Sequence, residues 1–254
     1  MSGPRVRSFG NCEISVDRRP APSSDWSPGL TMEPRALIMD FDGTIIDTES
    51  PAYESTAQIW ASYGIDFPME WWLAGMGTDR KSAWVQELEN RLGTQLDHDS
   101  VMKQRQRIKD ELTDSQPLLP GVLELLEATK KLGILTAVAS SSPHSWVDQH
   151  LKRVGLFESF SYVVCRDDVA GVSKPAPDVF LRALQLLGVT AGSAVAVEDS
   201  PNGLKAALAA GLRTIVVPNP LVESLNFSGA YARYKSLDDL PADQLLDLVF
   251  HDPN

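Results

Sequence analysis

The sequence predicts an α/β fold, in which a mostly parallel sheet carries helices on both faces and an all-helical segment is inserted after the first strand. From Pro120 onward, short apolar runs alternate with helix-like segments that end at glycines, a pattern typical of parallel sheets with right-handed crossovers. Residues 48–116 show helical periodicity and no convincing strand. The 254 residues are enough for one sizeable core and a smaller accessory domain.

Composition and charge exclude several classes of protein. The chain is 43% hydrophobic and 22% charged, as is ordinary for a globular protein, and its formal net charge is −11. It has no Lys/Arg-rich tract, so we expect no nucleic-acid partner. No apolar run reaches the roughly 18 residues of a membrane helix, and Cys12 and Cys165 form no disulfide or zinc pattern. We therefore expect a cytoplasmic protein without membrane contact, as a monomer or weak homodimer.

The first 31 residues are predicted to be a disordered extension. Proline, serine and glycine are frequent there, and no periodic apolar pattern is present. Met1 and Met32 are both candidate translation starts, since Met32 lies just ahead of the first apolar run. The core domain is expected at residues 32–47 and 117–254, and the helical segment at residues 48–116 interrupts it.

The almost wholly apolar run at residues 35–39 predicts a buried parallel strand, and acidic residues follow it directly. Asp40 and Asp42 flank Phe41, and Gly43 then permits a sharp turn. Because side chains alternate along an extended backbone, the two carboxylates can start on the same side of this strand end, which faces the ligand crevice in open α/β sheets. The alternative is an Asp-Gly turn that only terminates a core strand.

Three helices are expected in the inserted segment, at about residues 51–63, 80–92 and 99–114. Its small core is expected to contain the tryptophans Trp60, Trp71, Trp72 and Trp84. The loop at residues 75–81 joins flexible glycines to Arg80 and Lys81. It is either an element that selects the substrate or a helix start with solvated charges.

The remaining elements alternate in order along the chain. Helices are expected at about residues 120–132, 143–154, 177–187, 201–211 and 241–250, and strands at 134–139, 162–165, 194–197 and 214–217. Ser142 and Ser200 each precede a proline and are predicted to cap the helices that follow. Four histidines are predicted to be solvated: His98, His144, His150 and His251.

Polar side chains stand at the ends of three of the predicted strands. They are the aspartates above, Ser140 after the second strand, and Glu198 with Asp199 after the fourth. Lys174 lies in a loop just before a helix and can reach the same edge. Singly, each has a plainer explanation as a turn residue, a solvated cation or an acidic helix start. Because parallel strand ends share one edge of the sheet, we expect the four groups to meet.

Carboxylates combined with a lysine and a serine suit phosphoryl transfer. Carboxylate oxygens bind Mg²⁺, whereas an ammonium group and a hydroxyl group can hold phosphate oxygens. A carboxylate can act as the nucleophile and form an aspartyl phosphate. A second carboxylate can protonate the leaving oxygen and later deprotonate the attacking water. This division of roles accounts for two aspartates two residues apart.

The same residues, in the same order, resemble the four motifs of the haloacid dehalogenase superfamily. The matching segments are Asp40-Phe41-Asp42-Gly43-Thr44, Ser140, Lys174-Pro175, and Glu198-Asp199 with Asn202-Gly203. The segments GVSKPAPDVF and VEDSPNG are similar to the branch that contains β-phosphoglucomutase and small-metabolite phosphatases. The resemblance covers about residues 34–220 and implies a Rossmann-like core with a mobile helical cap.

The resemblance also implies a role for each matched residue. Asp40 would be the nucleophile and a Mg²⁺ ligand, and Asp42 the general acid and base, with its main-chain carbonyl on the metal. Asp199, supported by Glu198, would complete the metal site. The phosphoryl group would be held by Ser140 and Lys174, with Thr44 and Ser141 beside them. In the cap, Thr78, Arg80 and Lys81 would contact the substrate. True dehalogenases lack the second aspartate, so Asp42 argues against that activity.

Three functions remain to be distinguished. We favour a Mg²⁺-dependent phosphatase acting on a small phosphorylated metabolite, such as a sugar phosphate. The first alternative is a sugar phosphomutase similar to β-phosphoglucomutase, but Ala52 stands where those enzymes usually carry a histidine. The second is a regulator that binds a phosphorylated metabolite without turnover, although such a protein needs neither Asp40 nor Asp42.

Overall fold

The computed structural model describes residues 35–75, 83–239 and 241–251. The predicted disordered extension at residues 1–31, and the predicted substrate contacts Thr78, Arg80 and Lys81, lie outside these residues.

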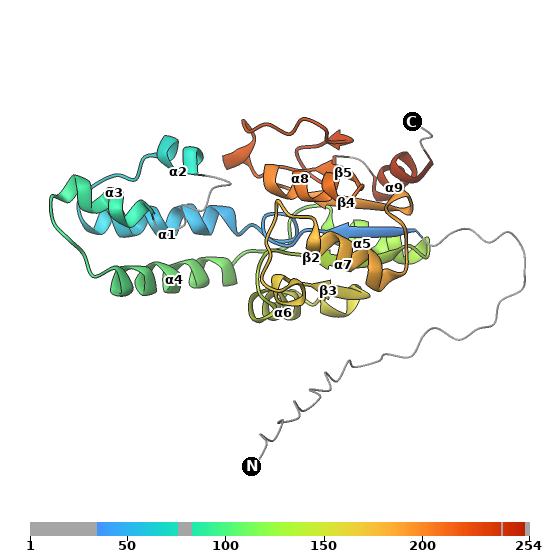
Figure 1. Cartoon of the computed structure of the whole chain (residues 1–254), viewed down its shortest axis with the longest axis horizontal. Helices are drawn as coiled ribbons and strands as arrows, with labels where there is room; N and C mark the ends of the chain where they lie inside the picture. The colour runs from blue at the N-terminus through green and yellow to red at the C-terminus, as the bar shows by residue number, and fades with distance from the viewer. Residues whose placement is uncertain (1–34, 76–82, 240, 252–254) are drawn as a thin grey trace, which may run out of the picture. The chain divides into compact units, whose positions relative to one another are not determined.

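A six-stranded sheet forms the centre of the fold (Figure 1). Its strands are β1 (Ala36–Met39), β2 (Leu135–Ala139), β3 (Tyr162–Val164), β4 (Ala194–Glu198), β5 (Arg213–Val216) and β6 (Ala232–Arg233). They lie in the order β3-β2-β1-β4-β5-β6, and every neighbouring pair is parallel. The predicted α/β class with a parallel sheet is thus confirmed.

The strand order places a topological switch point beside β1. Met39 pairs with Val138 of β2 on one side and with Val197 of β4 on the other. The chain builds outward from β1 to β3 and then crosses back to add β4 on the opposite side. In open parallel sheets the crevice outside the carboxyl ends of such strands is where ligands bind.

Helices cover both faces of the sheet. Successive side chains of β1 point alternately into the two apolar clusters that lie between the sheet and these helices. Leu37 and Met39 belong to one buried cluster, which takes in α5 (Val122–Lys131), α6 (His144–Arg153) and α9 (Ala242–His251). Ala36 and Ile38 point to the other face, where they meet α7 (Asp178–Leu187) and α8 (Pro201–Ala209). A strand buried on both faces needs a continuous apolar run, and residues 36–39 provide it.

The segment between β1 and α5 contains the helices α1 (Glu49–Ser62), α2 (Met69–Gly75), α3 (Ala83–Leu92) and α4 (His98–Asp114). No strand is present among its described residues. Trp60 and Trp84 are buried in a separate apolar cluster, and Trp71 and Trp72 pack against it. The predicted tryptophan core is therefore confirmed. The seven-residue α2 was not expected, because it is too short for a clear periodic signal.

Two local predictions are wrong. His150 is not solvated: it is 1% exposed, with its ring packed edge-on against Trp146. Ser142 does not cap α6, because Pro143 occupies the N-cap position and the Ser142 hydroxyl binds elsewhere. By contrast, Ser200 does cap α8, accepting a hydrogen bond from the Gly203 amide at 3.0 Å. Among the described helices, none combines the length and the apolar character that a membrane span requires.

Candidate active site

Asp40 lies at the carboxyl end of β1, directly at the switch point. Its amide donates to the Val197 carbonyl at 2.9 Å, which extends the pairing between β1 and β4 by one residue. The side chain is nearly excluded from solvent, with 6% of the residue exposed. The backbone therefore delivers this carboxylate to the centre of the sheet edge, next to Glu198 at the end of β4.

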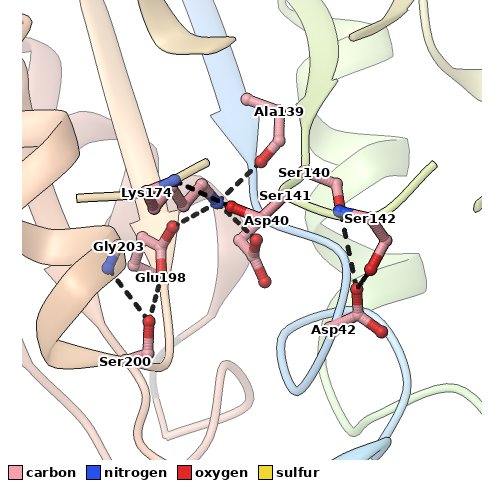
Figure 2. Close-up of polar contacts among 10 residues, drawn as sticks. All are labelled: Asp40, Asp42, Ala139, Ser140, Ser141, Ser142, Lys174, Glu198, Ser200 and Gly203. Atoms are coloured by element: carbon pink, nitrogen blue, oxygen red, sulfur yellow. Dashed lines mark hydrogen bonds and ion pairs between the residues drawn. The ribbon is translucent and has the colours of Figure 1, made fainter. Parts of the chain in front are cut away.

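Lys174 joins the carboxyl ends of three adjacent strands. Its Nζ donates to the Ala139 carbonyl of β2 at 2.7 Å and to Glu198 Oε1 of β4 at 2.6 Å, and it contacts Asp40 Oδ1 after β1 (Figure 2). The Lys174 amide donates to Ser141 Oγ at 3.0 Å, which fixes the loop that carries it. The predicted meeting of Lys174 with two strand-end carboxylates is confirmed.

Asp40, Glu198 and Asp199 form a buried acidic trio. Each can offer a carboxylate oxygen within 4.8 Å of those of the other two. Burial raises the pKa of Asp40 to about 8; Lys174 acts to lower it, whereas Glu198 and Asp42 raise it further. Burial, together with Asp40 and Glu198, raises the pKa of Asp199 well above its usual value. Asp40 and Asp199 therefore hold their protons more tightly than exposed aspartates do, because Lys174 alone cannot compensate three ionised carboxylates.

Two glycines leave room for these carboxylates. A Cβ atom on Gly43 would lie 2.1 Å from Asp199 Oδ2, and one on Gly203 would lie 1.8 Å from Glu198 Oε2. Gly43 also has a φ of 83°, which favours glycine. The site formed by these carboxylates is rich in oxygen atoms and has only one neighbouring cation, Lys174. It therefore fits a hard divalent cation such as Mg²⁺, which prefers carboxylate ligands.

Asp42 lies in a different environment from Asp40. Its Oδ2 is 2.5 Å from the Ser142 hydroxyl, and its Oδ1 accepts a hydrogen bond from the Trp146 indole at 2.8 Å (Figure 2 shows the serine contact). Ser140 Oγ lies farther away, at 3.5 Å from Oδ2. The aspartates are two residues apart, yet one contacts a cation and an acidic cluster, and the other contacts neutral donors.

The predicted phosphate-binding residues differ in how their hydroxyl groups are hydrogen-bonded. Ser140 is fully buried, and its Oγ accepts a hydrogen bond from the Ser142 amide at 3.0 Å. Ser141 Oγ is used by the Lys174 amide. Thr44 Oγ1 is buried and has no hydrogen-bond partner among the described residues. A buried hydroxyl group without a partner is one that a bound ligand can satisfy.

Several neighbours of the site carried no clear signal in the sequence. Ser142 and Trp146 hold Asp42, but in the sequence they read as a helix cap and an apolar helix position. From the insert, Lys109 Nζ lies 4.4 Å from the Trp146 ring centroid. Glu49 is the first residue of α1. Burial raises the pKa of Glu49 to about 6, and the negative charge of Asp42 acts in the same direction. Contacts of this kind depend on how helices pack, which periodicity does not reveal.

Comparison with known proteins identifies the family. The family described as haloacid dehalogenase-like hydrolase matches residues 37–217. YhcW of Bacillus subtilis (strain 168), which carries a provisional name as a phosphatase, is 37% identical over 213 residues, covering 84% of this chain and 96% of that protein. Hexitol phosphatase B of Escherichia coli (strain K12) is 31% identical over 229 residues, covering 83% of this chain and 96% of that protein.

A solved structure from Thermotoga maritima, provisionally named a β-phosphoglucomutase, superposes with a TM-score of 0.70 and 28% identity, covering 85% of this chain and 99% of that one. The family match spans both the acidic end of β1 and the Glu198-Asp199 pair. This chain belongs to the haloacid dehalogenase-like hydrolase family.

Proposed function

We propose that this protein is a Mg²⁺-dependent phosphatase that hydrolyses a small phosphorylated metabolite, a sugar phosphate or a related phosphomonoester. The observation that carries the proposal is the different environment of Asp40 and Asp42. Asp40 contacts Lys174 within a buried acidic trio, whereas Asp42 is held by neutral donors. Two carboxylates in unlike surroundings can take two unlike roles in one reaction. The phosphatase names of the relatives point in the same direction.

Asp40 is the proposed nucleophile. Its carboxylate oxygen forms a bond to phosphorus, the bond from phosphorus to the substrate oxygen breaks, and an aspartyl phosphate results. Lys174 keeps the attacking carboxylate oriented through the contact with Oδ1. The ammonium group also offsets negative charge at the transferring phosphoryl group. Thr44, Ser140 and Ser141 are proposed to bind its oxygens, and the unpartnered Thr44 hydroxyl supports that role among the described residues.

Asp42 is the proposed general acid and base. In the first step it gives a proton to the departing substrate oxygen, and in the second it takes one from the water that attacks the aspartyl phosphate. The second attack releases phosphate and restores the Asp40 carboxylate. The Ser142 and Trp146 contacts hold the Asp42 side chain apart from the acidic trio.

The Mg²⁺ would be held by Asp40, Asp199 and the main-chain carbonyl of Asp42, with Glu198 supporting Asp199. When bound, it supplies positive charge that polarises the phosphoryl group and offsets the acidic trio. The proximity of three carboxylates to one lysine, the raised pKa of Asp40, and the room left by Gly43 and Gly203 support this assignment.

The helical segment at residues 48–116 is proposed to act as a cap on a core formed by residues 32–47 and 117–254. Its separate apolar cluster supports this division. The proposed substrate contacts Thr78, Arg80 and Lys81 belong to this segment and lie outside the described residues. We further propose that the protein works in the cytoplasm, as a monomer or weak homodimer.

A sugar phosphomutase is the second candidate, and the name of the similar Thermotoga structure favours it. A mutase must keep water from the aspartyl phosphate while its intermediate turns around. Ala52, in the first half of α1, provides no polar side chain for that task. We therefore rank hydrolysis above phosphoryl transfer between sugar hydroxyls.

The test is phosphate release from hexitol phosphates, sugar phosphates, phosphoglycolate and glycerol phosphate, with Mg²⁺ and with EDTA. Asp40→Asn is measured beside the wild type, and isomerisation of glucose 1-phosphate is followed in parallel. We expect release that requires Mg²⁺ and disappears in Asp40→Asn. Isomerisation without release would establish the mutase instead. Binding of these compounds without either reaction would establish a regulator.

A further inference from the structure

We propose that Trp146 is a positioning residue for the Asp42 carboxylate, and that Lys109 of the inserted helix α4 holds the Trp146 indole in place. The inference rests on the proposed function, because Asp42 exchanges protons only if the chain catalyses phosphoryl transfer. It adds to that function a link between the helical insert and the general acid and base.

The hydrogen bonds to Asp42 fix the orientation of its carboxylate. The Trp146 indole nitrogen lies 2.8 Å from Oδ1 and can only donate, so Oδ1 must accept. The Ser142 hydroxyl lies 2.5 Å from Oδ2. With a separate partner on each oxygen, the carboxylate cannot rotate about its Cβ–Cγ bond without losing both contacts. Both partners come from the short stretch that follows β2.

Trp146 is itself held from several sides. The Lys109 ammonium lies 4.4 Å from its ring centroid, within the range of a cation–π interaction. The His150 ring packs edge-on at 4.3 Å between centroids. The indole also packs against the buried cluster that contains α5 and α6. A side chain contacted in this way has little freedom to swing its N–H away from Asp42.

The contact with Lys109 is part of a larger junction between α4 and α6. Arg153, seven residues after Trp146 and therefore on the same face of α6, donates to the Gln116 carbonyl at 3.0 Å and to the Thr113 carbonyl at 3.3 Å. The end of α4 therefore contacts α6 at two positions, Trp146 and Arg153. A shift of α4 would therefore act on Trp146, and through it on Asp42.

The tryptophans of the insert provide a contrast. The Nε1 atoms of Trp60, Trp72 and Trp84 are buried and have no hydrogen-bond partner among the described residues. Those side chains serve as apolar packing groups in the insert. The Trp146 indole, in contrast, donates a well-formed hydrogen bond to an ionisable residue of the candidate active site. Its N–H therefore has a role that the packing of a ring does not explain.

The decisive variant is Trp146→Phe, which keeps an aromatic ring and removes the donor. An alkyl phosphate has a poor leaving group that needs a proton, whereas p-nitrophenolate leaves without one. We therefore expect kcat/KM for a hexitol phosphate to fall about 10-fold or more, and kcat/KM for p-nitrophenyl phosphate to change much less. Trp72→Phe is the matched control, and both values should stay close to wild type.

Lys109→Met tests the link to the insert. It keeps the length of the side chain and removes the charge above the indole, so we expect the same selective loss, of smaller size, on the hexitol phosphate. Lys103→Met, at an exposed position of the same helix, is the control. Equal losses on both substrates in Trp146→Phe, or no loss in either variant, would overturn the inference.

A second measurement does not depend on turnover. The Trp146 indole N–H resonance, assigned by its absence from Trp146→Phe, should shift in Asp42→Ala and in Lys109→Met, whereas the Trp72 resonance should not. An unmoved Trp146 resonance would overturn the inference even if the enzyme is an active phosphatase. A wild-type protein that turns over no phosphomonoester while the resonance shifts would instead overturn the proposed function, and the positioning role with it.

Discussion

The Nζ atom of Lys174 lies 2.6 Å from Oε1 of Glu198, and their side chains are only 6% and 0% exposed. The same ammonium group contacts Asp40, so it faces two carboxylates in a part of the core that water scarcely reaches. A buried ion pair adds little stability relative to apolar packing, but a buried charge that loses its partner is costly. Lys174 thus has a structural role as well as its proposed chemical one.

Lys174→Met should therefore destabilise the protein as well as inactivate it. The substitution leaves the Asp40 and Glu198 carboxylates buried without their cation, which costs about 3–5 kcal/mol in the free energy of unfolding. Urea denaturation in EDTA at pH 9, above the raised pKa of Asp40, measures this loss. Lys130→Met, at an exposed position of α5, is the control and should change stability by less than about 0.5 kcal/mol. Equal stability of the two variants would show that Lys174 does not compensate the buried acids.

Removing one acid from the trio should have the opposite effect on stability. The raised pKa of Asp199 means that the folded protein binds a proton more readily than the unfolded chain does. Stability without metal is thus lost as the pH rises from the ordinary pKa of an aspartate towards the folded value. We expect Asp199→Asn to raise the melting temperature in EDTA at pH 8 and to flatten this pH dependence.

Magnesium should reverse this difference, so that the wild type becomes more stable than Asp199→Asn. An ion present at 100 times its Kd stabilises the folded state by about 2.7 kcal/mol. We expect such a Mg²⁺-dependent rise in the melting temperature of the wild type and a loss of most of it in Asp199→Asn. Calorimetry at several Mg²⁺ concentrations measures both. The same rise in the two proteins would mean that the ion binds elsewhere.

Gly203→Ala probes the space beside Glu198. The added Cβ would lie 1.8 Å from Glu198 Oε2, so the carboxylate must move away from Lys174 or α8 must shift. We expect at least about a 10-fold loss of phosphatase activity and weaker Mg²⁺ binding, since both rely on this carboxylate. Gly192→Ala is the matched control, because the nearest atom to its new Cβ would be 3.9 Å away. Full activity of Gly203→Ala would show that the position of Glu198 is not critical.

The sheet and its acidic edge could be predicted from the sequence because they follow from local pattern and topology. A continuous apolar run that ends in Asp40 fixes a buried strand, and the rule that parallel strand ends share one edge brings Glu198 to it. The position of Lys174 at this edge could also be predicted, because its loop immediately precedes a helix that packs on the sheet. The family match over residues 37–217 agrees with the predicted fold.

The surroundings of Asp42 could not be predicted in the same way. Trp146 lies on a helix whose periodicity shows which side is apolar, but not that an indole N–H meets the loop after β1. The sequence predicts that Ser142 caps α6, because a serine before proline commonly does so, yet its hydroxyl contacts Asp42 instead. In both cases a tertiary contact outweighs the local preference.

His144 gives a further prediction, on pH and stability. Its Nδ1 lies 3.0 Å from Asp148 and its Nε2 lies 2.8 Å from Asp168. Burial acts to lower the pKa of His144, but the two carboxylates outweigh it and raise the pKa above the usual 6.5. The stabilisation is therefore complete below about pH 6.5 and is lost as the pH rises through the folded value.

His144→Gln should consequently lower stability at pH 5.5 and have almost no effect at pH 9. The loss at pH 5.5 should stay below about 1 kcal/mol, because the imidazole is 35% exposed and solvent screens both pairs. Urea denaturation at the two pH values measures the difference. Asp168→Asn removes one of the two carboxylates. Its loss of stability should also be larger at pH 5.5 than at pH 9, but by a smaller margin than in His144→Gln. A loss of equal size at both pH values would mean that His144 contributes by packing and not by its charge.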